Sequence, residues 1–183
     1  MNGPEGQGTG IHATAVLYGD SGVLILGPSG SGKSALALAL LARARDTGRC
    51  GALVGDDRVW ARSRNGRLIA AGSTQLAGLI ERRAAGLVAA PHEPAAVIGL
   101  FVELSERGCV WPRMPDGSHV VTIEGVRLPR LALDSGGSAA DQALAVDECL
   151  STIAAYDEKR KGISLEHCAA VHKNGPLTGM PEA

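Results

Sequence analysis

The pattern of apolar residues near the amino terminus predicts two short strands joined by a tight turn. Residues 12–18 and Val23–Leu26 are mostly apolar, and Gly19–Gly22 between them is typical of a turn. Two strands joined by four residues pair antiparallel, because a parallel pair needs a long crossover. The run Ala35–Ala42 that follows consists of strong helix formers. The pattern therefore predicts an antiparallel hairpin whose second strand leads towards a helix.

The remaining pattern adds strands and a second helix. Further strands are predicted over residues 52–57, 58–62, 67–70, 97–104, 120–123 and 128–133. Asn65-Gly66 is typical of a hairpin turn, and residues 139–158 carry apolar side chains at helical spacing. These elements predict an α/β domain with a mixed, partly antiparallel sheet over residues 11–172. Residues 1–10 are predicted to be a disordered lead-in, and residues 173–183 a loose tail.

Composition and charge narrow the range of functions. The chain has 183 residues, of which 45% are hydrophobic, and a formal net charge of -1, which argues against nucleic acid as a partner. Its four cysteines are scattered without a C-x-x-C pair, so they predict free thiols in the cytoplasm and not a zinc site. The apolar stretches fall short of the about 18 residues that a membrane span needs. Five aromatic residues leave no stacking platform for a nucleobase.

The segment between the second strand and the helix matches the phosphate-binding pattern G-x-x-x-x-G-K-[ST]. It reads Gly27-Pro28-Ser29-Gly30-Ser31-Gly32-Lys33-Ser34. Its glycines allow backbone N–H groups to turn inward, where together with the helix N-terminus they hold phosphate oxygens. Lys33 would then reach the β- and γ-phosphates of ATP, and Ser34 a Mg²⁺ ion. A strand before the motif and a helix after it are the context that such a loop requires.

Two adjacent carboxylates end the strand that follows this helix. Successive side chains on a strand point to opposite faces, so we expect one of Asp56 and Asp57 to face the nucleotide. The other would turn aside or reach Mg²⁺. The pair is equally compatible with a carboxylate that only orders Mg²⁺ or with a solvated strand end. His12 carries no role by its position alone, since a single histidine at a strand start is most often a surface residue.

The order of these landmarks resembles the HPr kinase/phosphorylase family. His12 precedes the phosphate-binding loop, Leu53–Val59 with its two aspartates follows the loop, and Glu81–Gly86 stands where the family has E-[IV]-R-G-x-G. The resemblance covers roughly residues 11–150 and implies the short form of the family, which lacks the N-terminal domain. It also implies a phosphoenolpyruvate-carboxykinase-like fold, which would account for the antiparallel hairpin before the loop.

The resemblance implies an activity and its partners. It predicts an ATP- and Mg²⁺-dependent kinase that phosphorylates a serine of an HPr-like phosphocarrier protein. A reverse reaction is implied as well, in which inorganic phosphate attacks the phosphoserine and pyrophosphate leaves. The family further implies a homo-oligomer, a hexamer.

The resemblance also assigns acids and metal ligands by position. It makes Asp56 the general base that takes the proton of the serine hydroxyl, and it places His12 beside Asp56. It implies that Ser34 and Glu81 hold Mg²⁺, with Asp57 as a further ligand. These roles are expectations that depend on the alignment of short motifs.

Four basic residues complete the predicted site. Lys33 belongs to the phosphate-binding loop, and Arg83 matches the arginine of the family's E-x-R-G segment. By shorter matches, Arg113 corresponds to a later catalytic arginine, and Arg130 to a loop tied in the family to dephosphorylation.

One departure from the family pattern leaves a second function open. Ala84 replaces a glycine, and if the backbone has a positive φ there, alanine costs about 1 kcal/mol. An ATP-binding sensor or regulatory module with little phosphoryl transfer would tolerate such a change. A small-molecule P-loop kinase is disfavoured by the antiparallel hairpin, and a GTPase by the lack of an N-K-x-D motif in the sequence.

Overall fold

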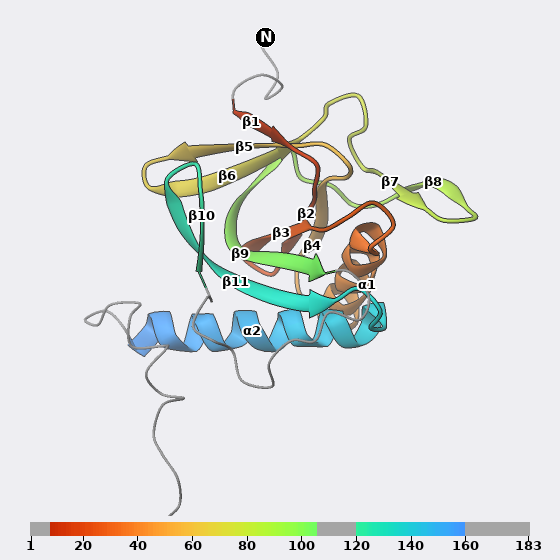
Figure 1. The fold of residues 1–183 in the computed structure, drawn as a ribbon. Coiled ribbons are helices and arrows are strands. Elements are labelled where there is room, and N and C mark those ends of the chain that lie inside the picture. Colours follow the sequence, from red (N-terminus) through yellow and green to blue (C-terminus); the bar gives the residue numbers. More distant parts are fainter. Residues whose placement is uncertain (1–7, 106–119, 160–183) are drawn as a thin grey trace, which may run out of the picture.

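A mixed sheet, a separate hairpin and two helices form the part of the chain that the computed structural model describes, residues 8–105 and 120–159 (Figure 1). The helices are α1 (Lys33–Asp46) and α2 (Ala139–Lys159). The strands are β1 (Thr9–Ile11), β2 (Thr14–Tyr18), β3 (Ser21–Leu26), β4 (Gly51–Gly55), β5 (Val59–Arg64), β6 (Arg67–Gly72), β7 (Leu79–Arg82), β8 (Gly86–Ala89), β9 (Ala95–Ser105), β10 (Val120–Ile123) and β11 (Val126–Asp134). Neither helix of these residues has the length and apolar character of a membrane span.

The main sheet has the order β1-β5-β6-β9-β3-β2-β4, and β11 pairs with β9 while β10 pairs with β11. The pairs β3–β9 and β9–β11 are parallel, and the other pairs are antiparallel. The predicted antiparallel hairpin before the phosphate-binding loop is confirmed as β2–β3, in which Val16 faces Val23. The hairpin at Asn65-Gly66 is confirmed as β5–β6. The predicted α/β class with a mixed, partly antiparallel sheet is therefore correct.

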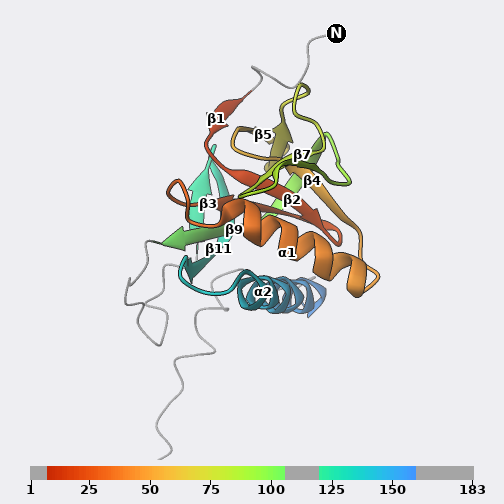
Figure 2. The ribbon, with the colours of Figure 1, turned by 90° about the vertical axis from the view of Figure 1, so that its right-hand side faces the viewer.

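Two apolar clusters fill the two faces of the sheet. Leu36 and Leu40 of α1 belong to the cluster under the helices, together with Ile25 of β3. The neighbouring residue Leu24 belongs to the cluster on the other face, as the alternation of side chains along a strand requires. Figure 2 shows α1 lying across the first of these faces and α2 lying beside α1. The helices therefore cover one face only.

The topology brings several chain segments to one edge of the sheet. Because β3, β9 and β11 run parallel, their carboxyl ends lie at the same edge, and α1 begins directly after β3. The strand β4 runs in the same direction as β3, since both are antiparallel to β2. Ligands of open α/β sheets bind beyond the carboxyl ends of parallel strands. This edge is therefore the place to look for a site.

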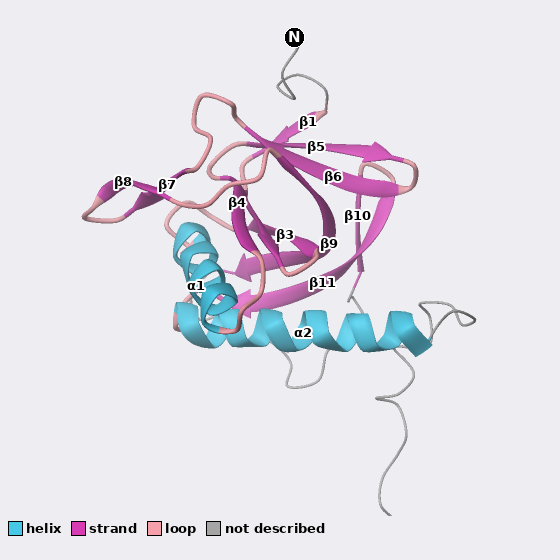
Figure 3. Cartoon of the chain, turned by 180° about the vertical axis from the view of Figure 1, so that it is seen from behind, coloured by secondary structure: helices cyan, strands magenta, loops and turns pink. Residues whose placement is uncertain are grey.

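The structure differs from the sequence prediction at two places. Thr9 and Gly10, placed in the disordered lead-in, form β1 with Ile11, because they pair with Ala61 and Trp60 of β5. The prediction also lacked the hairpin β7–β8, which pairs separately from the main sheet and projects from the body (Figure 3). Neither pairing has a local pattern of alternating buried side chains that would reveal it.

A charge cluster holds the two helices together. Asp147 of α2 is buried, and it accepts a hydrogen bond from Nε of Arg43 at 2.8 Å and a further contact from Arg49. Burial alone would raise the pKa of the Asp147 carboxyl, but the hydrogen bond from Arg43 and the positive charge of Arg49 outweigh it. The pKa of Asp147 therefore lies below its ordinary value.

Replacing Asp147 with asparagine should destabilise the fold at neutral pH by about 1–3 kcal/mol, because two arginines lose a buried partner. A carboxyl with a lowered folded-state pKa stabilises the fold above its unfolded pKa, and this contribution is lost as pH falls through the folded value. The difference between D147N and the parent in urea unfolding should thus shrink below about pH 4. Glu148→Gln, an exposed change one residue later, is the control and should change little. A difference that is constant from pH 7 to pH 3 would contradict the role of the charge.

Candidate active site

The predicted phosphate-binding loop joins β3 to α1 at the edge where the parallel strands end. Gly32 caps α1 with a φ of 98°, in the left-handed region that favours glycine. Gly27 has no room for a side chain, because a Cβ there would lie 2.6 Å from Oγ of Ser31 and 2.8 Å from the carbonyl oxygen of Leu104. The loop therefore needs glycine at both ends, once for conformation and once for close packing.

Lys33 is held in the loop with its charge only partly compensated. Its side chain is 8% exposed, and Nζ donates hydrogen bonds to the carbonyl oxygens of Gly27 at 3.0 Å and Pro28 at 3.1 Å. Among the ion pairs of the described residues, none involves Lys33. A buried ammonium group without a carboxylate partner favours an anion nearby. The loop thus provides a cation as well as backbone N–H groups for phosphate.

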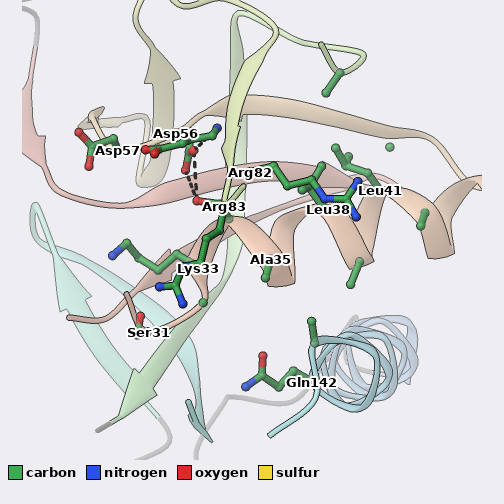
Figure 4. A pocket seen from close by; sticks show the side chains of 18 of the residues that line it. Ser31, Lys33, Ala35, Leu38, Leu41, Asp56, Asp57, Arg82, Arg83 and Gln142 are labelled. Carbon is green, nitrogen blue, oxygen red and sulfur yellow. Dashed lines mark hydrogen bonds between the residues drawn. The ribbon is translucent and has the colours of Figure 1, made fainter. Parts of the chain in front are cut away.

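Asp56 connects three elements around the loop. Its carboxylate accepts hydrogen bonds from the hydroxyl of Thr14 at 2.6 Å, from the hydroxyl of Ser34 at 3.1 and 3.2 Å, and from the backbone N–H of Glu81 at 3.1 Å. Dashed lines in Figure 4 mark hydrogen bonds at the Asp56 carboxylate. Asp56 therefore lies beside the hydroxyl that a phosphate-binding loop offers to Mg²⁺.

Asp57 faces a different partner. Its Oδ1 lies 3.0 Å from Nδ1 of His12, and 79% of its side chain is exposed. The structure thus pairs His12 with Asp57, the neighbour of the aspartate beside which His12 was expected. The reason is local: β4 ends at Gly55, and Asp57 has a φ of 65°, so the alternation expected of a strand no longer applies. The exposed His12–Asp57 pair is open to a substrate, whereas Asp56 is already engaged.

The hairpin β7–β8 carries two arginines next to the loop. Nη2 of Arg83 lies 3.6 Å from the position that a Cβ of Gly30 would occupy. In Figure 4 Arg83 points towards Lys33, while Arg82 points along α1 towards Leu38. Arg83 therefore adds a second cation at the phosphate-binding loop, whereas Arg82 points in another direction.

A cavity of about 1310 Å³ joins these groups. One part of its lining comes from the loop, the two aspartates, Glu81 and the hairpin arginines; another comes from Ser135, Gly137, Ala139 and Gln142. Drug-sized ligands occupy pockets of roughly 300–1,000 Å³. The cavity is therefore large enough for a nucleoside triphosphate.

The described residues also show which side chains could bind a metal ion. They contain no cluster of three or more His, Cys, Asp or Glu side chains that could hold an ion by itself. Ser34 and Asp56 nevertheless bring a hydroxyl and a carboxylate into contact beside the loop, and Glu81, whose backbone N–H bonds to the same carboxylate, also lines the cavity. Mg²⁺ prefers oxygen ligands and is usually bound by one or two carboxylates together with substrate phosphates. These donors fit Mg²⁺ that arrives with a nucleotide.

Sequence comparison finds relatives with one name. The chain is 28% identical over 144 residues to the HPr kinase/phosphorylase of Streptococcus salivarius, a match that covers 73% of the chain and 44% of that protein. It is 30% identical over 136 residues to the HPr kinase/phosphorylase of Streptococcus pyogenes serotype M5 (strain Manfredo), which covers 68% of the chain and 42% of that protein. No protein-family model matches the chain.

Structure comparison agrees. The HPr(Ser) kinase/phosphatase from Coxiella burnetii superimposes with a TM-score of 0.64 at 22% identity, covering 82% of this chain and 99% of that one. The chain is a homologue of the HPr kinase/phosphorylases. The family resemblance seen in the sequence is thereby confirmed, and the shared fold confirms the P-loop class. The chain spans about two-fifths of the length of the curated HPr kinase/phosphorylases that it matches.

The HPr kinase/phosphorylase pattern singled out two further arginines. Arg113 falls outside the described residues. Arg130 lies within β11 and forms an ion pair with Glu103, with 2.7 Å between Nη2 and Oε2, and it is not among the residues that line the cavity. The sequence analysis also did not identify Thr14 as a site residue. The feature that could have indicated it is a polar hydroxyl in a strand, at a position that the structure shows to be fully buried.

Ala84, which replaces a glycine of the HPr kinase/phosphorylase pattern, has a φ of 67°. A positive φ is the backbone conformation for which the sequence analysis expects alanine to be destabilising, because a side chain with a Cβ is strained in the left-handed region. The strain lies at the tip of the hairpin that carries Arg83. It therefore acts on the position of an arginine at the phosphate-binding loop.

Replacing Ala84 with glycine should raise the free energy of unfolding by about 0.5–1 kcal/mol, because it removes this strain. The matched control is Ala85→Gly, next to it in the same turn, where φ is not positive and glycine should destabilise. Urea unfolding of both variants measures the effect. Equal destabilisation by A84G and A85G would show that the strain is not present in solution.

Proposed function

We propose that the chain is an ATP-dependent protein kinase that phosphorylates a serine of an HPr-like phosphocarrier protein. The observation that carries this proposal is the arrangement around the phosphate-binding loop. Lys33 and Arg83 lie at the loop, and the Ser34 hydroxyl donates a hydrogen bond to Asp56. The exposed side chain of Asp57 pairs with His12. The sequence relatives named HPr kinase/phosphorylase support the choice of substrate.

The phosphates of ATP would bind to the N–H groups of residues 27–34 and to the ammonium group of Lys33. Ser34 and Asp56, with Glu81 beside them, would hold Mg²⁺. When bound, Mg²⁺ would neutralise negative charge on the transferred phosphoryl group. Arg83 would add positive charge from the hairpin, so that charge neutralisation comes from two sides of the loop.

The contacts support an exchange of the roles expected for the two aspartates. Asp56 accepts three hydrogen-bond donors and adjoins the metal-binding hydroxyl, which suits a group that orders Mg²⁺. Asp57 is exposed, and its partner His12 would orient its carboxylate. Asp57 would therefore take the proton from the serine hydroxyl as its oxygen attacks the γ-phosphorus and the bond to ADP breaks.

The same groups would serve a reverse reaction with inorganic phosphate. An oxygen of a phosphate ion bound in the loop would attack the phosphorus of the phosphoserine and form a new P–O bond, which gives a P–O–P linkage. The bond from phosphorus to the serine oxygen would break, and protonated Asp57 would return the proton to that oxygen. The products would be serine and pyrophosphate, so the site would use one phosphate nest in both directions.

Incubating the 183-residue chain with an HPr-like phosphocarrier protein and labelled ATP tests the proposal. The expected result is label on a serine, located by mass spectrometry, and its loss as pyrophosphate on addition of inorganic phosphate. ATP binding without any phosphoserine would favour the sensor over the kinase. Phosphoserine loss as free phosphate, at a rate independent of added phosphate, would rule out phosphorolysis and leave forward transfer in place.

A further inference from the structure

The cavity extends past the phosphate-binding loop to the loop between β11 and α2. Ser135, Gly137, Ala139 and Gln142 line this part, which none of the proposed catalytic groups reaches. The order of strands places it on the opposite side of β3 from the aspartates: β9 and β11 lie on one side of β3, and β2 and β4 on the other. Figure 4 shows the same separation, with Asp56 and Asp57 on one side of Lys33 and Gln142 on the other.

This separation orients a nucleotide. If the γ-phosphate lies towards Asp57, where the serine would be deprotonated, the nucleoside end must leave the phosphate-binding loop in another direction. The nucleoside end could lie in the part of the cavity at the start of α2, because this part and the phosphate-binding loop belong to one cavity. The lining of the whole cavity includes the small side chains of Ala35, Ala39 and Ala139, which leave space for a flat ring.

Gln142 projects a defined hydrogen-bonding group into this part. Only 6% of the residue is exposed, and its Nε2 donates to the backbone carbonyl oxygen of Asp134 at 2.7 Å. A carbonyl accepts but does not donate, so the amide nitrogen must face Asp134 and the amide oxygen must face away from it. No hydrogen bond from a described residue to that oxygen, Oε1, is present.

The Asp134 carbonyl is itself held in place, which fixes the amide. It also accepts the backbone N–H of Gly137 at 3.2 Å, while Oδ1 of Asp134 accepts the N–H of Gly136 at 2.8 Å. Ser138 caps the start of α2 through the N–H of Asp141 at 3.1 Å. Gln142 therefore presents an oriented acceptor on a rigid support. Among the described residues, Oε1 is not one of the fully buried polar atoms without a partner, so it faces the open space of the cavity, where a ligand or water can donate to it.

The geometry points to Gln142 as the residue that selects the base of the nucleotide, with Oε1 accepting a hydrogen bond from the exocyclic amino group of adenine. This assignment rests on the proposed ATP-dependent function. Adenine has a donor at its 6-position, whereas hypoxanthine and guanine have a carbonyl oxygen that would repel Oε1. A site built to bind a donor discriminates strongly against a ligand that lacks it, because a buried acceptor is then left unpaired. Selection here needs no aromatic stacking.

Calorimetric titration with Mg-ATP, Mg-ITP and pyrophosphate tests the assignment. ITP differs from ATP in the 6-position of the base, and pyrophosphate lacks the base altogether. The parent protein should bind ATP about tenfold more tightly than ITP. Gln142→Met, which keeps the length of the side chain but removes the acceptor, should weaken ATP about tenfold, leave pyrophosphate unchanged and bind ITP at least as tightly as the parent does. Leu144→Met on the exposed side of α2 is the control and should leave all three affinities unchanged.

The outcomes separate the two proposals. Equal affinities of the parent for ATP and ITP, or an ATP/ITP ratio that Q142M leaves unchanged, would overturn the role of Gln142 while the kinase proposal stands. A loss of all three affinities in Q142M would show that Gln142 supports the fold of the site and does not select the base, and thermal unfolding would reveal the same. If the parent binds neither ATP nor pyrophosphate, the proposed function fails, and the base selection fails with it.

Discussion

Replacing Lys33 with alanine should reduce phosphoryl transfer to the phosphocarrier protein by about a hundredfold or more and weaken ATP binding as well. Lys33 is a nearly buried cation whose ammonium contacts two carbonyl oxygens of its own loop, so a phosphate that enters competes only with neutral partners. Removing such a preorganised charge from a site of developing negative charge typically costs about 10²–10³ in rate. Rates with saturating and limiting ATP would separate the loss in turnover from the loss in binding.

The control for this variant is Arg64→Ala, which removes an exposed positive charge in the β5–β6 hairpin and should leave both rates unchanged. Because Lys33 begins α1, thermal unfolding of K33A should accompany the kinetics. Unchanged turnover in a folded K33A protein would contradict the assignment of residues 27–34 as the phosphate-binding loop.

The sequence predicted those parts of the fold that depend on neighbouring residues. The hairpin β2–β3, the phosphate-binding loop and the start of α1 follow one another directly, and each has its own signal in turn residues, apolar runs or helix formers. The parallel pairing of β3 with β9 and of β9 with β11 had no such signal, because the partners are far apart in the chain. Only the packed structure shows that four carboxyl ends share one edge.

The hairpin β7–β8 shows why a functional segment can lack a structural signal. Its turn contains Arg83, Ala84 and Ala85, none of which favours a turn with positive φ, and Ala84 adopts one nevertheless. Of the four residues of β7, Ile80 alone is buried, so the strand shows no regular alternation. The hairpin was therefore visible in the sequence only as a family motif.

The site was predicted in its residue types but not in all of its contacts. The loop motif predicted Lys33 and Ser34 side by side because it specifies its own backbone, whereas the contact of Ser34 with Asp56 joins residues that are far apart in the chain. The contact of His12 with Asp57 depends on where β4 ends and on a positive φ after it, and neither follows from side-chain alternation. That difference changes which aspartate is placed to receive a proton.

The two aspartates should consequently respond differently to the same substitution. Asp57→Asn keeps the size of the side chain but removes the proton acceptor, so turnover in both directions should fall by about 10²–10⁴ while Mg-ATP still binds. Asp56→Asn instead replaces one of the oxygens near Ser34 by an amide nitrogen, so it should weaken the binding of Mg-ATP, with a smaller effect on turnover at saturating Mg²⁺. Steady-state kinetics at several Mg²⁺ concentrations, with calorimetry of nucleotide binding, separate these effects.

His12→Asn is the further test, because it removes the imidazole without touching either carboxylate. If His12 orients Asp57, H12N should lower turnover with ATP affinity unchanged. The assignment fails if Asp56→Asn abolishes turnover at saturating Mg²⁺ while Asp57→Asn only weakens nucleotide binding. In that case the carboxylate held by Thr14, Ser34 and Glu81 would have to release these partners to accept the serine proton, and the structure of the nucleotide complex would differ from the present one at Asp56.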